Sequence, residues 1–69
     1  MKTQTACVRA ILDAFTSNIG GRPFTMNEAA EWAEREGLYP TPKRGDPPAA
    51  FEEFETRLDA VRKRISAGQ

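Results

Sequence analysis

Three glutamates, Glu28, Glu31 and Glu34, recur at intervals of three residues in the middle of the chain. Carboxylates at that spacing could act as a general acid and base, or could hold a hard cation. General acid–base catalysis needs a pocket that excludes water, and none is expected in a domain this small. We therefore interpret these residues as a solvated helix face, and predict no enzyme activity, no cofactor and no bound metal.

The chain contains one cysteine, Cys7, and no histidine. A cysteine nucleophile needs a neighbouring base, and the usual one is missing. The same composition excludes a disulfide within one chain and the common zinc sites. Cys7 is therefore interpreted as a small apolar core residue, and its isolation favours a reducing cytoplasm.

Ten basic side chains balance ten acidic ones, so the net charge is zero and does not imply strong attraction to nucleic acid. The Lys43-Arg44-Gly45 stretch offers one glycine, whereas a phosphate loop needs several converging backbone amides, so it is interpreted as a solvated turn. Basic side chains that could still contact phosphates are Arg22, Lys43, Arg44, Arg57, Arg62, Lys63 and Arg64.

Helical patterns predict three helices that position these side chains, over about residues 5–18, 26–36 and 48–65. The middle helix has both ends marked. Thr25 is an expected N-cap with Glu28 three residues later, and Gly37 supplies a left-handed residue at the other end. Met26 and Trp32 fall on its apolar face, with Trp32 expected to be partly buried.

Asp46 is the expected N-cap of the last helix, followed by two prolines in the first turn. The apolar residues of this helix form a narrow seam, which either packs on the other two helices or pairs with a second copy of the chain. The seam consists of Phe51, Phe54, Leu58, Val61 and Ile65.

The 69 residues are expected to form one all-α domain over 1–69. Its predicted architecture is a compact three-helix, helix-turn-helix-like unit with a proline-rich connection before the last helix. No stretch resembles a signal peptide or a membrane span.

The stretch from Gly21 to Pro42 resembles the HARE-type helix-turn-helix, a family of the winged-helix superfamily. That family occurs in restriction systems, in chromatin-associated proteins and in a subunit of bacterial RNA polymerase. The resemblance covers about a third of the chain and implies a helix-turn-helix-like fold with a DNA- or protein-binding role. It is carried by Arg22, Pro23, Phe24, Thr25, Glu28, Ala29, Ala30, Gly37, Leu38, Tyr39, Pro40, Thr41 and Pro42.

Two features of the sequence differ from a DNA-binding winged helix. The start of the last helix, which would meet the major groove, carries Glu52, Glu53 and Glu55, and carboxylates repel phosphates. Too few residues follow that helix to form a wing. We therefore favour a small regulatory module that binds another protein through Tyr39, Pro40, Glu31 and Glu34, within transcription or mobile-element machinery. The alternative is weak DNA binding through the basic residues named above.

Overall fold

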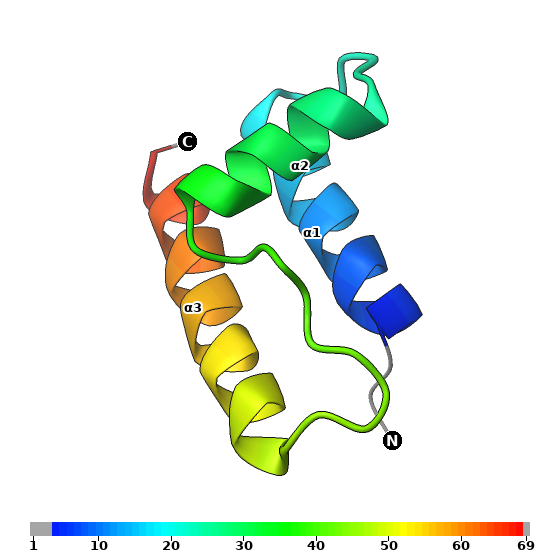
Figure 1. The fold of residues 1–69 in the computed structure, drawn as a ribbon. Helices are drawn as coiled ribbons and strands as arrows, with labels where there is room; N and C mark the ends of the chain where they lie inside the picture. Colours follow the sequence, from blue (N-terminus) through cyan, green and yellow to red (C-terminus); the bar gives the residue numbers. More distant parts are fainter. Residues whose placement is uncertain (1–3, 69) are drawn as a thin grey trace.

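The computed structural model describes residues 4–68, which contain three α-helices and no strand (Figure 1). They are α1 (Gln4–Asn18), α2 (Met26–Arg35) and α3 (Pro48–Ala67). The predicted all-α, three-helix unit is confirmed, and each helix begins and ends close to its predicted bounds. None of the helices in this range has both the length and the apolarity needed to cross a membrane.

Both other helices pack on α1. Helices α1 and α3 lie side by side, α2 lies across one end of the pair, and the 36–47 connection runs back along them to the start of α3 (Figure 1). The core forms where these parts meet, and Phe15 of α1 is at its centre. The Phe15 ring contacts Phe24 edge-on at 4.8 Å between centroids, and contacts Trp32 at 5.2 Å. The buried apolar residues are Cys7, Ile11, Ala14, Phe15, Ala29, Trp32, Ala33, Leu38, Phe54, Leu58 and Val61.

Helix α2 begins and ends as its sequence predicts. The Thr25 side chain accepts a hydrogen bond from the Glu28 amide at 3.2 Å, which satisfies one of the donors that a helix start leaves unpaired. At the other end Gly37 has a φ of +79°, a left-handed conformation that a side chain would strain. The Leu38 amide donates back to the Ala33 carbonyl at 2.7 Å, which closes the last turn.

One expectation about helix ends is wrong. Pro47, not Asp46, is the N-cap of α3, and it makes no side-chain capping bond. The Asp46 carboxylate instead accepts from the Lys43 amide at 2.7 Å, and the Asp46 amide donates to the Lys43 carbonyl at 2.9 Å, so it closes a turn within the connection. Met26, the first residue of α2, is 61% exposed.

Trp32 is buried more deeply than expected, at 7% exposure, and its ring packs against Phe15 at a tilt of 35°. Cys7 is also buried, in agreement with its interpretation as a core residue.

Candidate protein-binding surface

Tyr39 and Pro40 form an exposed step at the beginning of the 36–47 connection. Tyr39 is 51% exposed, and the peptide bond to Pro40 is cis. The residues on either side are buried: Leu38 is 1% exposed, and Thr41 and Pro42 lie in the interior. The chain is therefore anchored immediately before and after the step, and the aromatic ring is presented on a fixed backbone.

Helix α3 fastens the backbone just before this step. Arg57 Nη1 donates to the Gly37 carbonyl at 3.0 Å, and Arg57 Nη2 donates to Glu53 Oε1 at 2.6 Å. Glu36, the residue before Gly37, accepts from Arg64 Nη2. These two arginines tie the end of α2 to α3, so the position of Tyr39 depends on how these two helices are held together.

The two predicted acidic contacts, Glu31 and Glu34, are exposed on α2, one turn apart and without an ion-pair partner among residues 4–68. Glu34 belongs to the last turn of the helix, which leads through Gly37 to Tyr39. The structure thus places the four predicted partner-binding residues on two consecutive segments, with the aromatic step following the acidic helix face.

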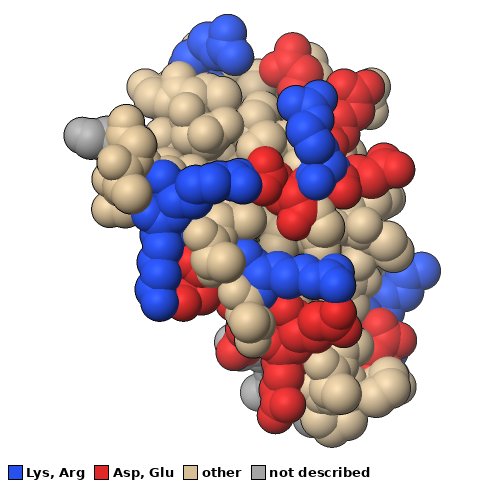
Figure 2. All heavy atoms as spheres, turned by 90° about the vertical axis from the view of Figure 1, so that its left-hand side faces the viewer, with Lys and Arg blue, Asp and Glu red and all other residues tan. Residues whose placement is uncertain are grey.

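Most of the predicted phosphate contacts on α3 are already engaged inside the molecule. Arg57 pairs with Glu53, Lys63 pairs with Asp59 at 3.1 Å, and Arg64 pairs with Glu36. Figure 2 shows the result on the α3 side, where basic and acidic side chains alternate without a continuous basic area.

The remaining basic candidates are dispersed. Lys43 and Arg44 are exposed at the loop before α3, and Arg22 is exposed in the turn before α2, at the other end of the molecule in Figure 1. Basic side chains that position a protein on DNA must lie in a row along the phosphates of the DNA backbone. The described structure does not bring the seven basic candidates into one such row.

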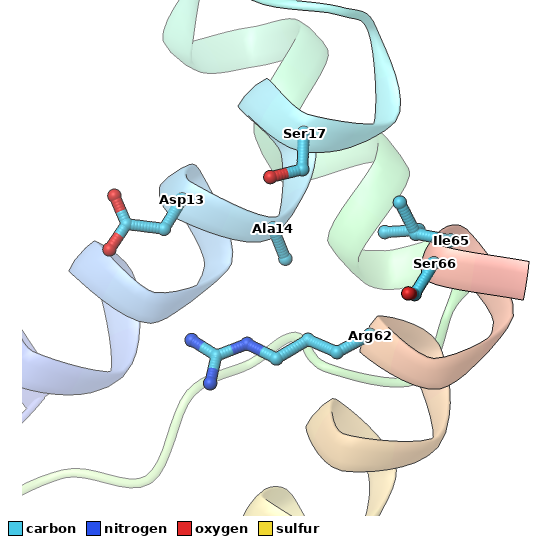
Figure 3. A pocket seen from close by; sticks show the side chains of 6 residues that line it. All are labelled: Asp13, Ala14, Ser17, Arg62, Ile65 and Ser66. Carbon is cyan, nitrogen blue, oxygen red and sulfur yellow. The ribbon is translucent and has the colours of Figure 1, made fainter. Parts of the chain in front are cut away.

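Arg62 lies in a groove of about 390 Å³ between α1 and α3. Its side chain extends from α3 toward α1, in a groove also lined by Asp13, Ser17 and Ser66 (Figure 3). The two serines belong to the last turns of their helices, where the helix dipole is negative. This dipole and the Asp13 carboxylate make the groove less favourable for a phosphate at Arg62.

The seam of α3 packs within the chain. Phe54, Leu58 and Val61 are buried, and Phe51 and Ile65 are half-buried against the same core. Of the two readings of this seam, the intramolecular one is the one observed. A homodimer through these five residues would have to replace the contacts that hold α3 on α1.

A small cavity beside the aromatic step was not anticipated from the sequence. It has a volume of about 210 Å³ and lies between the 36–47 connection and the first half of α3. Thr41 lines it and is 4% exposed, and its Oγ1 has no hydrogen-bond partner in the described structure. No local sequence signal distinguishes this threonine from an exposed one, because its burial depends on contacts with α3.

Comparison of the chain with protein-family models, with curated proteins and with solved structures found no match in any of the three. The resemblance to the HARE-type helix-turn-helix therefore stays a prediction. A unit of three helices is compatible with that family and with many others.

Proposed function

We propose that this protein is a small non-enzymatic regulatory module that binds another protein through the Tyr39–Pro40 step, with Glu31 and Glu34 of α2 at the side of the contact. The observation that carries the proposal is an exposed tyrosine on a backbone anchored by buried neighbours. Tyrosine is enriched among the residues that dominate interface energies, and a fixed backbone lowers the entropic cost of binding.

The charge distribution supports a protein partner over DNA. Three of the four basic side chains near the C-terminal half of α3 form surface ion pairs with carboxylates of the same chain. A partner that carries basic side chains would complement the exposed carboxylates of Glu31 and Glu34. The HARE-type resemblance is the reason for assigning the partner to transcription or mobile-element machinery.

Two substitutions with matched exposure test the proposal. Tyr39 and Met26 are the large apolar side chains that are exposed among residues 4–68. Tagged protein is used to capture partners from host extract, with Tyr39→Ala and Met26→Ala variants in parallel. We expect a protein that is retained by the parent chain and by Met26→Ala, and is lost with Tyr39→Ala.

Affinity for that protein should fall about 30-fold or more for Tyr39→Ala, which corresponds to a hot-spot loss of about 2 kcal/mol. Tyr39→Phe keeps the ring and should retain most of the affinity. The free energy of unfolding should be nearly unchanged in both variants, because the Tyr39 side chain is half exposed. Equal capture by Tyr39→Ala and by the parent chain would overturn the assignment of this surface.

Weak DNA binding is the second candidate, and the exposure of Lys43 and Arg44 is the observation in its favour. About three phosphate contacts predict a log–log salt slope of roughly −3, at about 0.9 per contact. A gel shift with Lys43→Glu/Arg44→Glu is the sharper test, because reversing Arg64 would also break its pair with Glu36. A salt-sensitive shift that is lost in this double variant and indifferent to Tyr39→Ala would favour DNA over a protein partner.

A further inference from the structure

The cavity beside Tyr39 combines apolar walls with hydrogen-bond acceptors. Pro40 and Ala50 contribute accessible apolar surface, whereas Leu38, Pro42 and Phe54 line the cavity but are almost fully buried. Thr41 also lines it and carries the hydroxyl that lacks a partner. With about 210 Å³ the cavity is smaller than the sites that hold whole metabolites or cofactors, which begin at about 300 Å³. It matches the size of one side chain from another molecule.

The charges around the cavity indicate which type of side chain it could bind. Asp46 and Glu53 supply two carboxylates, and Arg57 supplies one positive charge, which leaves a net charge of −1. The guanidinium of Arg57 already donates to the Gly37 carbonyl and to Glu53 Oε1. Asp46 Oδ2 likewise accepts from the Lys43 amide, so one oxygen of each carboxylate stays available to a ligand. The net charge of −1 therefore favours a cationic group over an anionic one.

We infer that this cavity is a binding site for a lysine side chain of the protein partner. The aliphatic stem of lysine would lie along Pro40 and Ala50, as such stems do on apolar surface. The ammonium group has three donors and no acceptor, so it complements the two carboxylates and the hydroxyl. The inference rests on the proposed function and adds the chemistry of the partner: a basic segment that contacts Tyr39 and inserts a lysine beside it.

The unpaired hydroxyl is the second, independent observation behind this inference. A buried hydroxyl without a partner is unfavourable in the free protein, and native structures keep few such groups. Thr41 Oγ1 is also closed off from solvent, so pairing with a ligand requires the side chain to turn to another staggered rotamer. A lysine ammonium in the cavity would supply the hydrogen bond that the free chain lacks.

The test uses the full chain and two short peptides. The first is acetyl-Gly-Lys-Gly-amide, and the second replaces lysine by norleucine, which keeps the stem and removes the ammonium. Binding is followed by the backbone amide resonances of Thr41, Glu53 and Arg57. We expect saturable shifts with a millimolar dissociation constant for the lysine peptide, and at least about tenfold weaker binding of the norleucine peptide.

Two neighbouring glutamates provide a matched pair of variants. Glu53 lines the cavity, whereas Glu52 is exposed on the same helix and does not. Glu53→Gln should weaken lysine binding about fivefold or more, and Glu52→Gln should leave it unchanged. Thr41→Val should also weaken it, although this variant removes no charge. Circular dichroism of each variant confirms that the helices persist.

Three outcomes would overturn the inference. Equal affinity for the two peptides would mean that the cavity binds only the apolar stem. Equal losses of affinity in Glu52→Gln and Glu53→Gln would mean that the peptide is attracted by the overall negative charge and not by a defined site. Absence of saturable shifts would mean that the cavity takes no lysine. The Tyr39→Ala variant separates the lysine site from the proposed function, because the variant should abolish partner capture and leave peptide binding intact. Peptide binding without any Tyr39-dependent partner would overturn the proposed function alone.

Discussion

Replacing Thr41 by valine should stabilise the protein. The hydroxyl of Thr41 is buried, and its Oγ1 has no hydrogen-bond partner in residues 4–68. An unsatisfied buried polar group costs about 1–3 kcal/mol, and valine has nearly the same shape without that group. We take the lower bound, since the larger methyl must be accommodated against α3, and expect the free energy of unfolding to rise by about 1 kcal/mol.

A gain of this size is measurable in a domain of this length. Total stability is expected at about 0.05–0.15 kcal/mol per residue, so 1 kcal/mol is a substantial fraction. It should raise Tm by about 4–8 °C. Urea unfolding, followed by circular dichroism and by Trp32 fluorescence, should show a higher midpoint with an unchanged slope.

Thr56→Val is the matched control. Thr56 is exposed on α3, where its hydroxyl donates to the Glu52 carbonyl at 2.9 Å, and valine and threonine have similar helix propensities. This variant should change the free energy of unfolding by no more than about 0.5 kcal/mol. A loss of stability for Thr41→Val would refute the reasoning, because it would mean that the hydroxyl has a partner in solution. A gain in stability together with weaker lysine-peptide binding would indicate that the hydroxyl is retained for binding.

Three further predictions concern the elements that position the surface. Thr25→Ala should cost about 1 kcal/mol, since the Glu28 amide loses its acceptor, and an unchanged Tm would contradict the cap. Trp32 fluorescence should be blue-shifted in the native protein and move to the red in urea, whereas water-like native emission would contradict its burial. Arg57→Met keeps the aliphatic stem and removes the donor to the Gly37 carbonyl. The variant should lower the free energy of unfolding by about 1 kcal/mol and speed amide hydrogen exchange in the 36–47 connection, and unchanged exchange would contradict the role of this hydrogen bond.

The parts of the fold that sequence could predict are those with local physical causes. A hydroxyl three residues before an amide donor, and a glycine where the chain must turn left-handed, are properties of neighbouring residues. Thr25 and Gly37 therefore mark the ends of α2 correctly. The ion pairs Glu53–Arg57 and Asp59–Lys63 follow from helical spacing in the same way.

The errors and omissions have a common physical cause, which is competition between possible partners, local at Asp46 and between distant residues elsewhere. Asp46 has the right chemistry for a helix cap, but the amide of Lys43 offers a better-placed donor. The burial of Thr41 and the engagement of Arg64 by Glu36 arise only when the connection and α3 lie together. A sequence pattern indicates which types of residue can pair, but it does not show which possible partner lies nearest to a given side chain in the folded chain.

The packing of both α2 and α3 on α1 has a consequence for experiments that use fragments. The stretch with the family resemblance contains α2 and the aromatic step, but α1 supplies the Phe15 ring on which Trp32 and Phe24 rest. A fragment trimmed to residues 21–68 would expose that apolar surface and lose its common scaffold, and a domain this small has little stability to spare. Such a fragment would fail to bind any partner because it does not fold, and this negative result would not test the role of Tyr39. A minimal binding unit must therefore begin within or before α1.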